Sequence, residues 1–527
     1  MKHRKLLSLV ALCLIFIMAF PAQVLAEKGE EPITLRILTR AAEAANPKES
    51  MYTKFLEEKF NVNLEFLFAP DFVTYYNLML ESKDYPDIIS GALSTGQVIA
   101  GAQSGALLPL NDFIKDGTNL KAILDEYPEY VPYFTANDGN IYTFTVRSQA
   151  VHQDANCKMW YRAEWLDKLG WDHEPATTEE FKEFLIQIRD NDVNGNGDPS
   201  DEIPLMGYVS ANITSSVLPF LMNSFEYYPD LGNKGPCYYI TDGGDIAFTG
   251  NTDGYRKGLA YITDLYNEGL IAEETFVQDA DTFKLSLNRT GEEALVGCYP
   301  FWYYGNIDRK VQSWFTYEAL PPLMGDYQQT PARNGGINFD LNSAITTACK
   351  HPEKAFEIFD WMLSEEANWI GFFGFEGVTY EWVDAENFNG TSPAIKQTTY
   401  TNNNSVTWPS GTYPRFETAE RRYSVIKDES VFETDNTWQL VKSSAKYAPY
   451  HRYNNFPRFN WADDDITAEY NEYFNLFSDY IYTTSVEFIM GIRDINDDKQ
   501  WQDYKDELDR MGLSEYIEIL KAYYHLG

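Results

Sequence analysis

Residues 33–40 read ITLRILTR, residues 49–60 read ESMYTKFLEEKF, and residues 62–68 read VNLEFLF. The first and third segments have the apolar pattern of β-strands, whereas the middle segment spaces its apolar side chains as an amphipathic helix does. A second helix over 75–82 and a short strand over 87–90 continue the alternation. This order predicts an α/β fold with a mainly parallel sheet that helices cover on both faces.

Sheets of this kind bind ligands beyond the carboxyl ends of their strands. Arg40 ends the first strand, and Asp87 and Ser90 lie where the third strand meets its loop. Their charged and hydroxyl groups can hydrogen-bond a polar ligand, and all three are therefore candidate ligand contacts. An ordinary surface charge or a satisfied turn is the alternative explanation for each.

The whole chain of 527 residues is acidic, with 79 Asp and Glu against 42 Lys and Arg and a formal net charge of −37. We expect no nucleic-acid partner, because phosphate binding needs a basic surface. The chain is 44% hydrophobic and 16% aromatic, which is enough apolar surface to form a core and argues against intrinsic disorder. Its length favours roughly two to four domains.

Residues 1–26 have the features of a secretory signal peptide: a basic start, an apolar run and a small-residue exit at Ala26. Residues 27–32 then form a short polar tether. A transmembrane anchor is the alternative, but the apolar run is shorter than the roughly 20 residues that span a bilayer. Leu12 precedes Cys13 where a lipobox needs a small residue. We therefore expect an extracellular or cell-surface protein without a recognisable lipobox cysteine.

Four cysteines follow the predicted signal peptide, namely Cys157, Cys237, Cys298 and Cys349. They have no CxxC spacing and are too few for a disulfide-rich scaffold. An oxidising exterior permits one or two bridges, and buried free thiols are equally consistent with the sequence. The disulfide state is therefore open at this point.

The segment 192–202, DVNGNGDPSDE, follows a predicted helix and has the start of a calcium-binding loop. Oxygen-bearing side chains at positions 1, 3 and 5 and Gly at position 6 are typical of an EF-hand loop. Position 12 is Ile203, and the closing carboxylate therefore comes early. We expect a structural Ca²⁺ site, with an acidic Asn-Gly turn as the alternative. The expected ligands are Asp192, Asn194, Asn196, Asp198, Asp201 and Glu202.

No catalytic motif is recognisable in the chain. It contains no HExxH, GxSxG or Walker sequence, and its six histidines have no metal-ligand spacing. A glycosidase needs two carboxylates placed across the scissile bond, and no local motif nominates such a pair. We therefore expect a protein that is not an enzyme.

Several sequence stretches, taken in their order along the chain, indicate a protein family more specifically than any one stretch does. They are WYRAEWLDKLG over 160–170, PATTEEF over 175–181, the acidic loop, LPPLMG over 320–325 and GFEGVTYEW over 374–382. Together they resemble the family 1 extracellular solute-binding proteins of ABC importers, carbohydrate type. The resemblance is nearest to the LplA-like and alginate-binding long members, in which the equivalent loop binds structural calcium.

The resemblance implies a two-lobed, periplasmic-binding-protein-like (type II) α/β fold with an interlobe cleft and a hinge. The N-terminal lobe would comprise 33–150 with about 331–395, and the C-terminal lobe 151–330 with about 396–527. The implied function is capture of an oligosaccharide and its delivery, by a monomer, to the transmembrane subunits of an ABC permease. A non-sugar solute such as a peptide, or a secreted carbohydrate-active enzyme, is the alternative.

Aromatic faces suit the C–H side of a sugar ring. The segment GCYPFWYY over 297–304 is similar to a stretch of maltose-binding protein in which a Trp stacks on sugar. Trp302 is the first candidate and Tyr303 the second, whereas core packing is the better explanation for Phe301. Further candidates for the cleft are Tyr380, Glu381, Trp382, Trp408 and Trp461.

Overall fold

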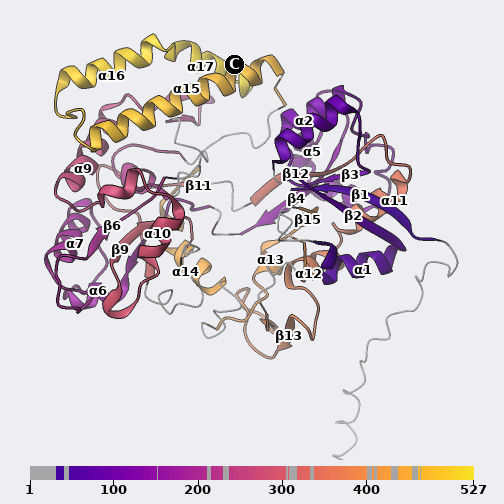
Figure 1. Cartoon of the computed structure of the whole chain (residues 1–527), viewed down its shortest axis with the longest axis horizontal. Helices are drawn as coiled ribbons and strands as arrows, with labels where there is room; N and C mark the ends of the chain where they lie inside the picture. Colours follow the sequence, from indigo (N-terminus) through magenta and orange to yellow (C-terminus); the bar gives the residue numbers. More distant parts are fainter. Residues whose placement is uncertain are drawn as a thin grey trace, which may run out of the picture.

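The structure is a computed structural model in which two hydrophobic cores form around two separate sheets (Figure 1). It describes residues 31–40, 47–69, 71–150, 152, 154–209, 215–229, 237–303, 307, 317–332, 337–399, 406–408, 412–428, 437–453, 461–462 and 464–526. The predicted signal peptide and nearly all of the predicted tether lie outside these described residues.

The N-terminal lobe is built on a six-stranded sheet. Its strands are β1 (Ile33–Thr39), β2 (Val62–Phe68), β3 (Ile88–Ser90), β4 (Thr143–Gln149), β12 (Ile337–Ile345) and β15 (Arg415–Phe416), in the order β15-β4-β12-β3-β1-β2. β1 pairs in parallel with β2 and β3, as predicted, whereas β12 runs antiparallel to β3 and β4. β12 enters the sheet as the chain returns from the other lobe, and no βα crossover therefore forces it to run parallel.

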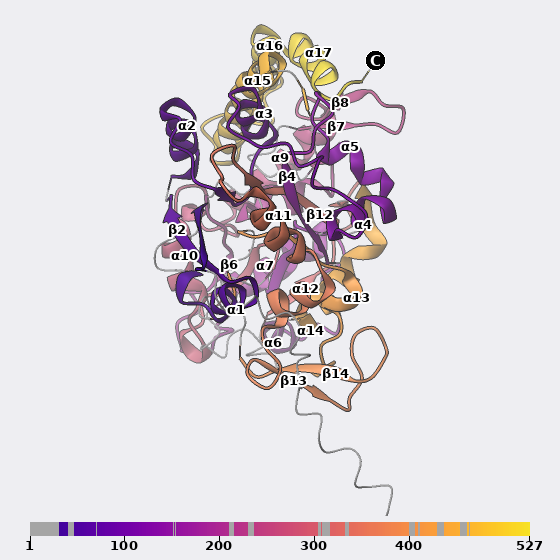
Figure 2. The same cartoon turned by 90° about the vertical axis from the view of Figure 1, so that its right-hand side faces the viewer.

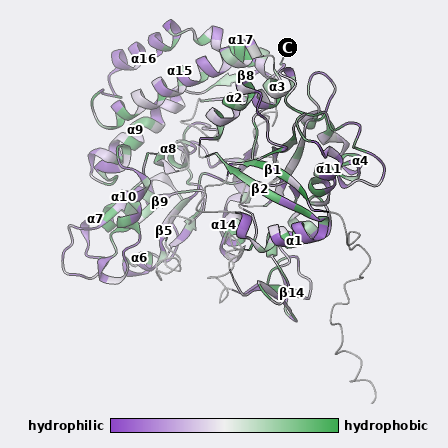
Figure 3. Ribbon diagram, turned by 45° about the vertical axis from the view of Figure 1, so that its right-hand side comes forward, coloured by the Kyte–Doolittle hydropathy of each residue, from purple (hydrophilic) through white to green (hydrophobic). Residues whose placement is uncertain are grey.

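Helices cover this sheet on both sides. They are α1 (Met51–Phe60), α2 (Phe72–Ser82), α3 (Thr95–Gln103), α4 (Asn119–Glu126), α5 (Val131–Phe134), α11 (Pro352–Trp361) and α12 (Glu365–Phe373). α1 begins where the Ser50 hydroxyl accepts the Thr53 N–H, and it ends at Asn61 in the left-handed region. Tyr52 and Leu56 of its inner face are fully buried. Figure 2 shows α11 in front of β4 and β12, and Figure 3 shows the hydrophobic character of β1 and β2.

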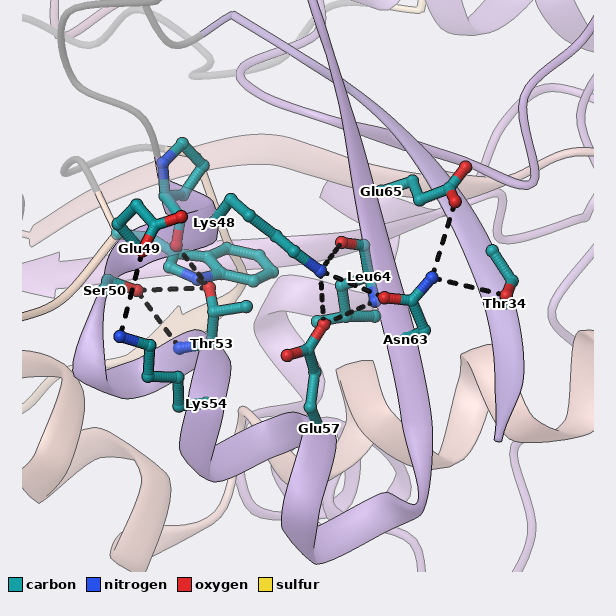
Figure 4. Close-up of polar contacts among 12 residues, drawn as sticks. Thr34, Lys48, Glu49, Ser50, Thr53, Lys54, Glu57, Asn63, Leu64 and Glu65 are labelled. Atoms are coloured by element: carbon teal, nitrogen blue, oxygen red, sulfur yellow. Dashed lines mark hydrogen bonds and ion pairs between the residues drawn. The ribbon is translucent and has the colours of Figure 1, made fainter. Parts of the chain in front are cut away.

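A polar network fastens the start of α1 to β2 (Figure 4). The ammonium of Lys48 donates to Glu57 Oε1 at 2.7 Å, to Asn63 Oδ1 at 3.0 Å and to the Leu64 carbonyl at 2.9 Å. Glu57 Oε1 also accepts the Leu64 N–H at 2.9 Å. Charge-assisted hydrogen bonds of this kind are stronger than neutral ones, and they hold the first βαβ unit in register.

The C-terminal lobe contains a four-stranded sheet in the order β10-β5-β9-β6. The strands are β5 (Met159–Arg162), β6 (Ile203–Leu205), β9 (Val296–Pro300) and β10 (Tyr317–Leu320), and a separate hairpin joins β7 (Tyr238–Ile240) to β8 (Ile246–Phe248). The surrounding helices are α6 (Ala163–Lys168), α7 (Thr178–Asp190), α8 (Val217–Met222), α9 (Asp253–Asn267) and α10 (Ala280–Leu287). α7 begins where the Thr177 hydroxyl accepts the Glu180 N–H.

The last helices of the chain extend the C-terminal lobe. They are α14 (Thr437–Tyr447), α15 (Asp464–Ile489), α16 (Asp498–Arg510) and α17 (Leu513–Tyr523), and α15 to α17 lie along the upper edge of Figure 1. α15 packs against both α9 and α17, and the rings of Tyr470 and Tyr523 stack with centroids 3.8 Å apart. Within the described part of the chain, none of the helices combines the length and the apolar character that a membrane span requires.

The chain passes between the lobes where β4 ends and β5 begins, and again where β11 (Thr330–Ala332) precedes β12. The later boundary differs from the expected one near 395. Tyr413 and Phe416 pack in the N-terminal core, whereas Leu440 packs in the C-terminal core. β15 adds to β4 in the first sheet, and residues 412–416 therefore belong to the N-terminal lobe.

The described cysteines are free and buried, namely Cys157, Cys237, Cys298 and Cys349. Burial raises the pKa of the Cys237 thiol to about 12 and that of the Cys349 thiol to about 11. Thiols buried in this way react slowly, because the thiolate is the nucleophile. The structure therefore favours the free-thiol alternative over disulfide bridges.

Candidate ligand-binding site and cation loop

The carboxyl edge of the first sheet holds two of the predicted contact residues. Arg40, just after β1, is exposed, and its guanidinium lies 5.1 Å from the centre of the Phe72 ring. Ser90, at the end of β3, is 1% exposed, and its hydroxyl bonds to the Thr412 carbonyl and lies 3.2 Å from Ser343 Oγ. Arg40 is therefore accessible to a ligand, whereas the Ser90 hydroxyl is used inside the lobe.

Asp87 lies at the other end of β3 from Ser90. Its carboxylate Oδ2 accepts the Arg36 N–H at 2.8 Å, and its carbonyl accepts the Thr346 N–H at 3.0 Å. These bonds join β3 to the strands on either side of it. The structure therefore gives Asp87 a role in the sheet and does not bring it to the edge that holds Arg40.

Trp302 and Tyr303 follow the carboxyl end of β9 in the C-terminal lobe. Both side chains are half-buried, and their ring centroids lie 4.0 Å apart at an interplanar angle of 41°. The preceding Phe301 packs against the C-terminal core and lies 6.4 Å from the buried ring of Tyr208. The structure therefore places the two leading aromatic candidates at a strand end, and Tyr303 packs against the same core as Phe301.

Two basic residues that the sequence did not nominate lie beside Trp302. The His152 ring stacks on it at 5.8 Å and 24°, and the Lys158 ammonium donates to its carbonyl at 3.1 Å. His152 is 5% exposed and Lys158 is fully buried. The sequence signal for Lys158 is its position directly before the buried strand β5, where a Lys is uncommon.

Burial dominates the electrostatics of this cluster. It lowers the pKa of Lys158 to about 7. Burial, and then the charges of Arg422 and Lys158, hold the pKa of His152 well below its usual value. Burial and Lys158 also lower the pKa of His451, on β16 (His451–Tyr453). The two imidazoles are therefore uncharged near neutral pH, and the ring that faces Trp302 is a flat neutral surface.

The segment 380–382 lies away from this cluster, in a small third hydrophobic group. Tyr380, Glu381 and Trp382 are on β13 (Tyr380–Val383), which pairs with β14 (Ala394–Gln397). Tyr380 is buried, Glu381 is exposed and Trp382 is 40% exposed. The Trp382 ring packs edge-on against Trp369 of α12, with centroids 5.7 Å apart. This hairpin sits at the lower end of the N-terminal lobe in Figure 1.

Trp408 and Trp461 are core residues of the N-terminal lobe, contrary to the expectation that they line a cleft. Trp408 is 3% exposed, and its indole N–H donates to Thr53 Oγ1 at 2.7 Å. Trp461 is 8% exposed, and its carbonyl accepts the Asn137 amide at 2.7 Å. Their Asn- and Pro-rich surroundings in the sequence are typical of loops, but tertiary packing buries both indoles.

The acidic loop between α7 and β6 folds around its own side chains. Asp192 accepts the N–H groups of Gly195 and Gly197 at 2.7 and 2.8 Å. Asn194 and Asn196 each donate a side-chain amide hydrogen to Asp201, at 3.0 and 2.7 Å. Gly195 and Gly197 both have positive φ, of 83° and 92°, which favours glycine. The loop therefore has the turn geometry that the sequence predicted.

Glu202 is the residue of this loop that best indicates a cation. It is 7% exposed, and its buried oxygen Oε2 has no hydrogen-bond partner among the described residues. Burial, the largest cause, and the nearby Asp201 raise the pKa of Glu202, although hydrogen bonds from backbone N–H groups such as that of Asn194 oppose the shift. Nowhere in the described part of the chain do three carboxylate, imidazole or thiol groups converge as metal ligands. Amide and backbone oxygens would therefore have to complete a site.

Comparison with known proteins assigns the chain to a class. Residues 50–400 match the model of the family described as bacterial extracellular solute-binding protein. The chain therefore belongs to this family of extracellular solute-binding proteins, which confirms the resemblance seen in its ordered motifs, and it has their two-lobed α/β fold.

The fructooligosaccharide ABC transporter substrate-binding protein FusA of Streptococcus pneumoniae is 30% identical over 528 residues, which cover 94% of this chain and 90% of FusA. The solved structure of a FusA EF-hand mutant in complex with fructo-nystose superposes with a TM-score of 0.74 at 26% identity, covering 93% of this chain and 99% of that one. Alginate-binding protein AlgQ2 without calcium ion has a TM-score of 0.64 at 21% identity, covering 94% and 98%, which shows the shared fold.

Proposed function

We propose that this protein captures an oligosaccharide between its two lobes and delivers it to an ABC permease. The observation that carries the proposal is the pair of half-buried rings, Trp302 and Tyr303, at the carboxyl end of β9. Aromatic faces at a strand end can stack on the C–H side of a sugar ring. The fructooligosaccharide-binding relative FusA supports this ligand class.

Arg40 is the matching polar group on the other lobe. It is exposed at the carboxyl edge of the first sheet, and a guanidinium there can donate several hydrogen bonds to sugar hydroxyls. Closure of two α/β lobes about a hinge would bring such groups together around a bound ligand. The protein then acts as an exported monomer, without catalysis, and its further partners are the transmembrane subunits of the permease.

Calorimetry against a panel of sugars tests the proposal. The panel contains kestose and nystose, because FusA structures contain kestose and fructo-nystose, together with maltotriose and an unrelated tripeptide. We expect binding of at least one oligosaccharide, weakened about 10- to 100-fold by Trp302→Ala, since each tenfold is about 1.4 kcal/mol. Binding of the tripeptide alone would overturn the sugar assignment.

Trp171→Ala is the matched control for Trp302→Ala. Trp171 is also a half-buried residue of the C-terminal lobe, but its indole N–H donates to Gln187 Oε1 at 2.9 Å, within the lobe. We expect its removal to change stability and to leave sugar affinity within twofold. An equal loss of affinity in the two variants would contradict the placement of the ligand on Trp302.

We further propose that the acidic loop binds a structural Ca²⁺. Calcium takes six to eight oxygen ligands, and the unpartnered Glu202 Oε2 is a ready one. The FusA relative, solved as an EF-hand mutant, supports such a loop in this family. The holding residues would be Asp192, Asn194, Asn196, Asp198, Asp201 and Glu202. The ion would supply a charge that compensates these carboxylates and fixes the turn between α7 and β6.

Calcium binding requires Asn194 and Asn196 to change the orientation of their side-chain amides. Their amide N–H groups now face Asp201, and they must turn their oxygens toward an ion to ligate it. Calcium titration of chelator-treated protein by calorimetry should show one site, and Glu202→Gln should weaken it at least tenfold. Heat signals that are identical in the variant would contradict the assignment.

A further inference from the structure

The loop that carries Trp302 is held by the segment that crosses between the lobes. This crossing segment comprises residues 150–158, of which 151 and 153 lie outside the described residues. The Lys158 carbonyl accepts the Phe301 N–H at 2.9 Å, and the Lys158 ammonium donates to the Trp302 carbonyl at 3.1 Å. Lys158 therefore holds the backbone at two points, the Phe301 N–H and the Trp302 carbonyl.

His152 contacts the side chain of Trp302, whereas Lys158 holds its backbone. Its ring lies 5.8 Å from that of Trp302 at 24°, close to a parallel stack. The imidazole therefore packs against the indole, which the Tyr303 ring also contacts, with centroids 4.0 Å apart. Since His152 is buried, a flexible surface contact does not explain the stacking.

His152 also lies between charges of the two lobes. Arg422, on α13 (Ala419–Arg422), lies beside the N-terminal sheet, and its guanidinium contacts Ser148 Oγ of β4 at 3.4 Å. Lys158 precedes β5 of the C-terminal sheet. Both cations act electrostatically on the His152 ring. A rotation of one lobe against the other therefore changes the surroundings of the residue that packs on Trp302.

Burial of Lys158 costs folding free energy that a purely structural role does not explain. It is fully buried, and the hydrogen bond of its ammonium goes to a carbonyl rather than to a carboxylate. The Tyr447 ring, 5.8 Å away, adds a cation–π contact. Within the described part of the chain this ammonium has no carboxylate partner, and burial of such a group destabilises a fold more than an apolar residue in the same space would. Its position is therefore best explained by what it holds.

We infer that His152 and Lys158 are positioning residues that orient the indole of Trp302 and couple its sugar-stacking face to the crossing between the lobes. This inference rests on the proposed function, because it takes the Trp302 indole as a contact of the sugar. The sugar ring would then stack on a surface whose angle depends on lobe closure.

A double-mutant cycle tests the coupling. His152→Ala should weaken oligosaccharide binding at least fivefold in the native background, whereas His152→Phe, which keeps a flat ring, should restore most of the affinity. In a Trp302→Ala background, His152→Ala should change affinity less than twofold. Equal effects of His152→Ala in the two backgrounds would overturn the inference, because they would show that His152 acts independently of Trp302.

Lys158→Met and Lys158→Arg give an independent arm. We expect at least a fivefold loss with Met and partial rescue with Arg, which retains donors to the Trp302 carbonyl. Lys182→Met and His173→Ala are controls, since Lys182 pairs with Asp264 and Glu268, and His173 with Asp172, at the surface of the same lobe. If the Met variant fails to fold, the His152 cycle still decides the question.

A spectroscopic readout separates this inference from the proposed function. Near-ultraviolet circular dichroism reports the fixed environment of an indole, and the Trp302→Phe difference spectrum defines the Trp302 contribution. His152→Ala and Lys158→Met should remove most of that contribution in ligand-free protein. Persistence of the signal would overturn the positioning role. Its loss in a protein that binds no sugar would support positioning while the proposed function fails.

Discussion

The carboxylate of Glu417 lies 2.7 Å from the guanidinium Nε of Arg422, in an ion pair whose Glu417 side chain is only 2% exposed. The same carboxylate accepts the Ser148 hydroxyl at 3.0 Å. The Glu417 N–H donates to the Arg147 carbonyl at 2.8 Å, and the Arg147 guanidinium donates to the Glu417 carbonyl at 2.9 Å. The end of β4 is therefore fastened to the later segment of the N-terminal lobe immediately before the chain crosses to the other lobe.

Glu417→Ala should strongly destabilise the N-terminal lobe. The change leaves the mostly buried Arg422 without its counter-charge, and breaking such a pair from one side costs about 3–5 kcal/mol. Urea unfolding measures the difference. Glu366→Ala is the control, because its pair with Lys59 is half-exposed and should contribute less than about 1 kcal/mol. Similar losses of unfolding free energy in the two variants would show that the buried ion pair contributes no more than the exposed one.

Lys158 should make stability depend on pH above neutrality. Its pKa is about 7 in the folded protein and about 10.4 when unfolded, and the unfolded chain therefore binds more protons between these values. The free energy of unfolding rises with pH in that window, by roughly 1.4 kcal/mol per unit at most, and this contribution is lost as pH falls toward 7. Unfolding of native protein and Lys158→Met at pH 7.5 and 9.0 measures the slope. An identical slope in the two proteins would contradict the depressed pKa.

Trp408→Ala should separate stability from binding. Trp408 packs among Tyr52, Phe66 and Tyr413 and donates to Thr53, and removal of a buried Trp costs about 3–5 kcal/mol. We expect a large fall in unfolding free energy with sugar affinity of the folded protein unchanged within twofold. A selective loss of affinity would instead place Trp408 in the ligand site.

Removal of calcium should lower the melting temperature. An ion that binds only the folded state stabilises it by about 2.7 kcal/mol when present at 100 times its Kd. Differential scanning calorimetry in EDTA, and again after Ca²⁺ is restored in excess, measures the effect. Glu202→Gln should respond less to both treatments. A native protein that melts at the same temperature in EDTA and in excess calcium would argue against the site.

Local sequence patterns were sufficient to predict the first strands and helix and the acidic loop. Alternation and helical spacing over 33–90 predicted β1, α1, β2 and β3, because these elements follow from side-chain periodicity that neighbouring residues determine. The acidic loop was predicted for the same reason, since glycines and Asx side chains act on their own backbone within a few residues. The start of α2, at Phe72 rather than 75, shows the usual limit at helix ends.

The sequence by itself determined the α/β class, the turn of the acidic loop and the candidacy of Trp302 and Tyr303. Tertiary structure decided which strands share a sheet, and it placed Trp408 and Trp461 in a core. It also brought His152 and Lys158 to Trp302, from about 145 residues away along the chain. Side-chain periodicity is a local property, whereas burial and contact depend on which distant segments pack together. Strand order and the surroundings of an aromatic ring are therefore settled only when the whole chain is folded.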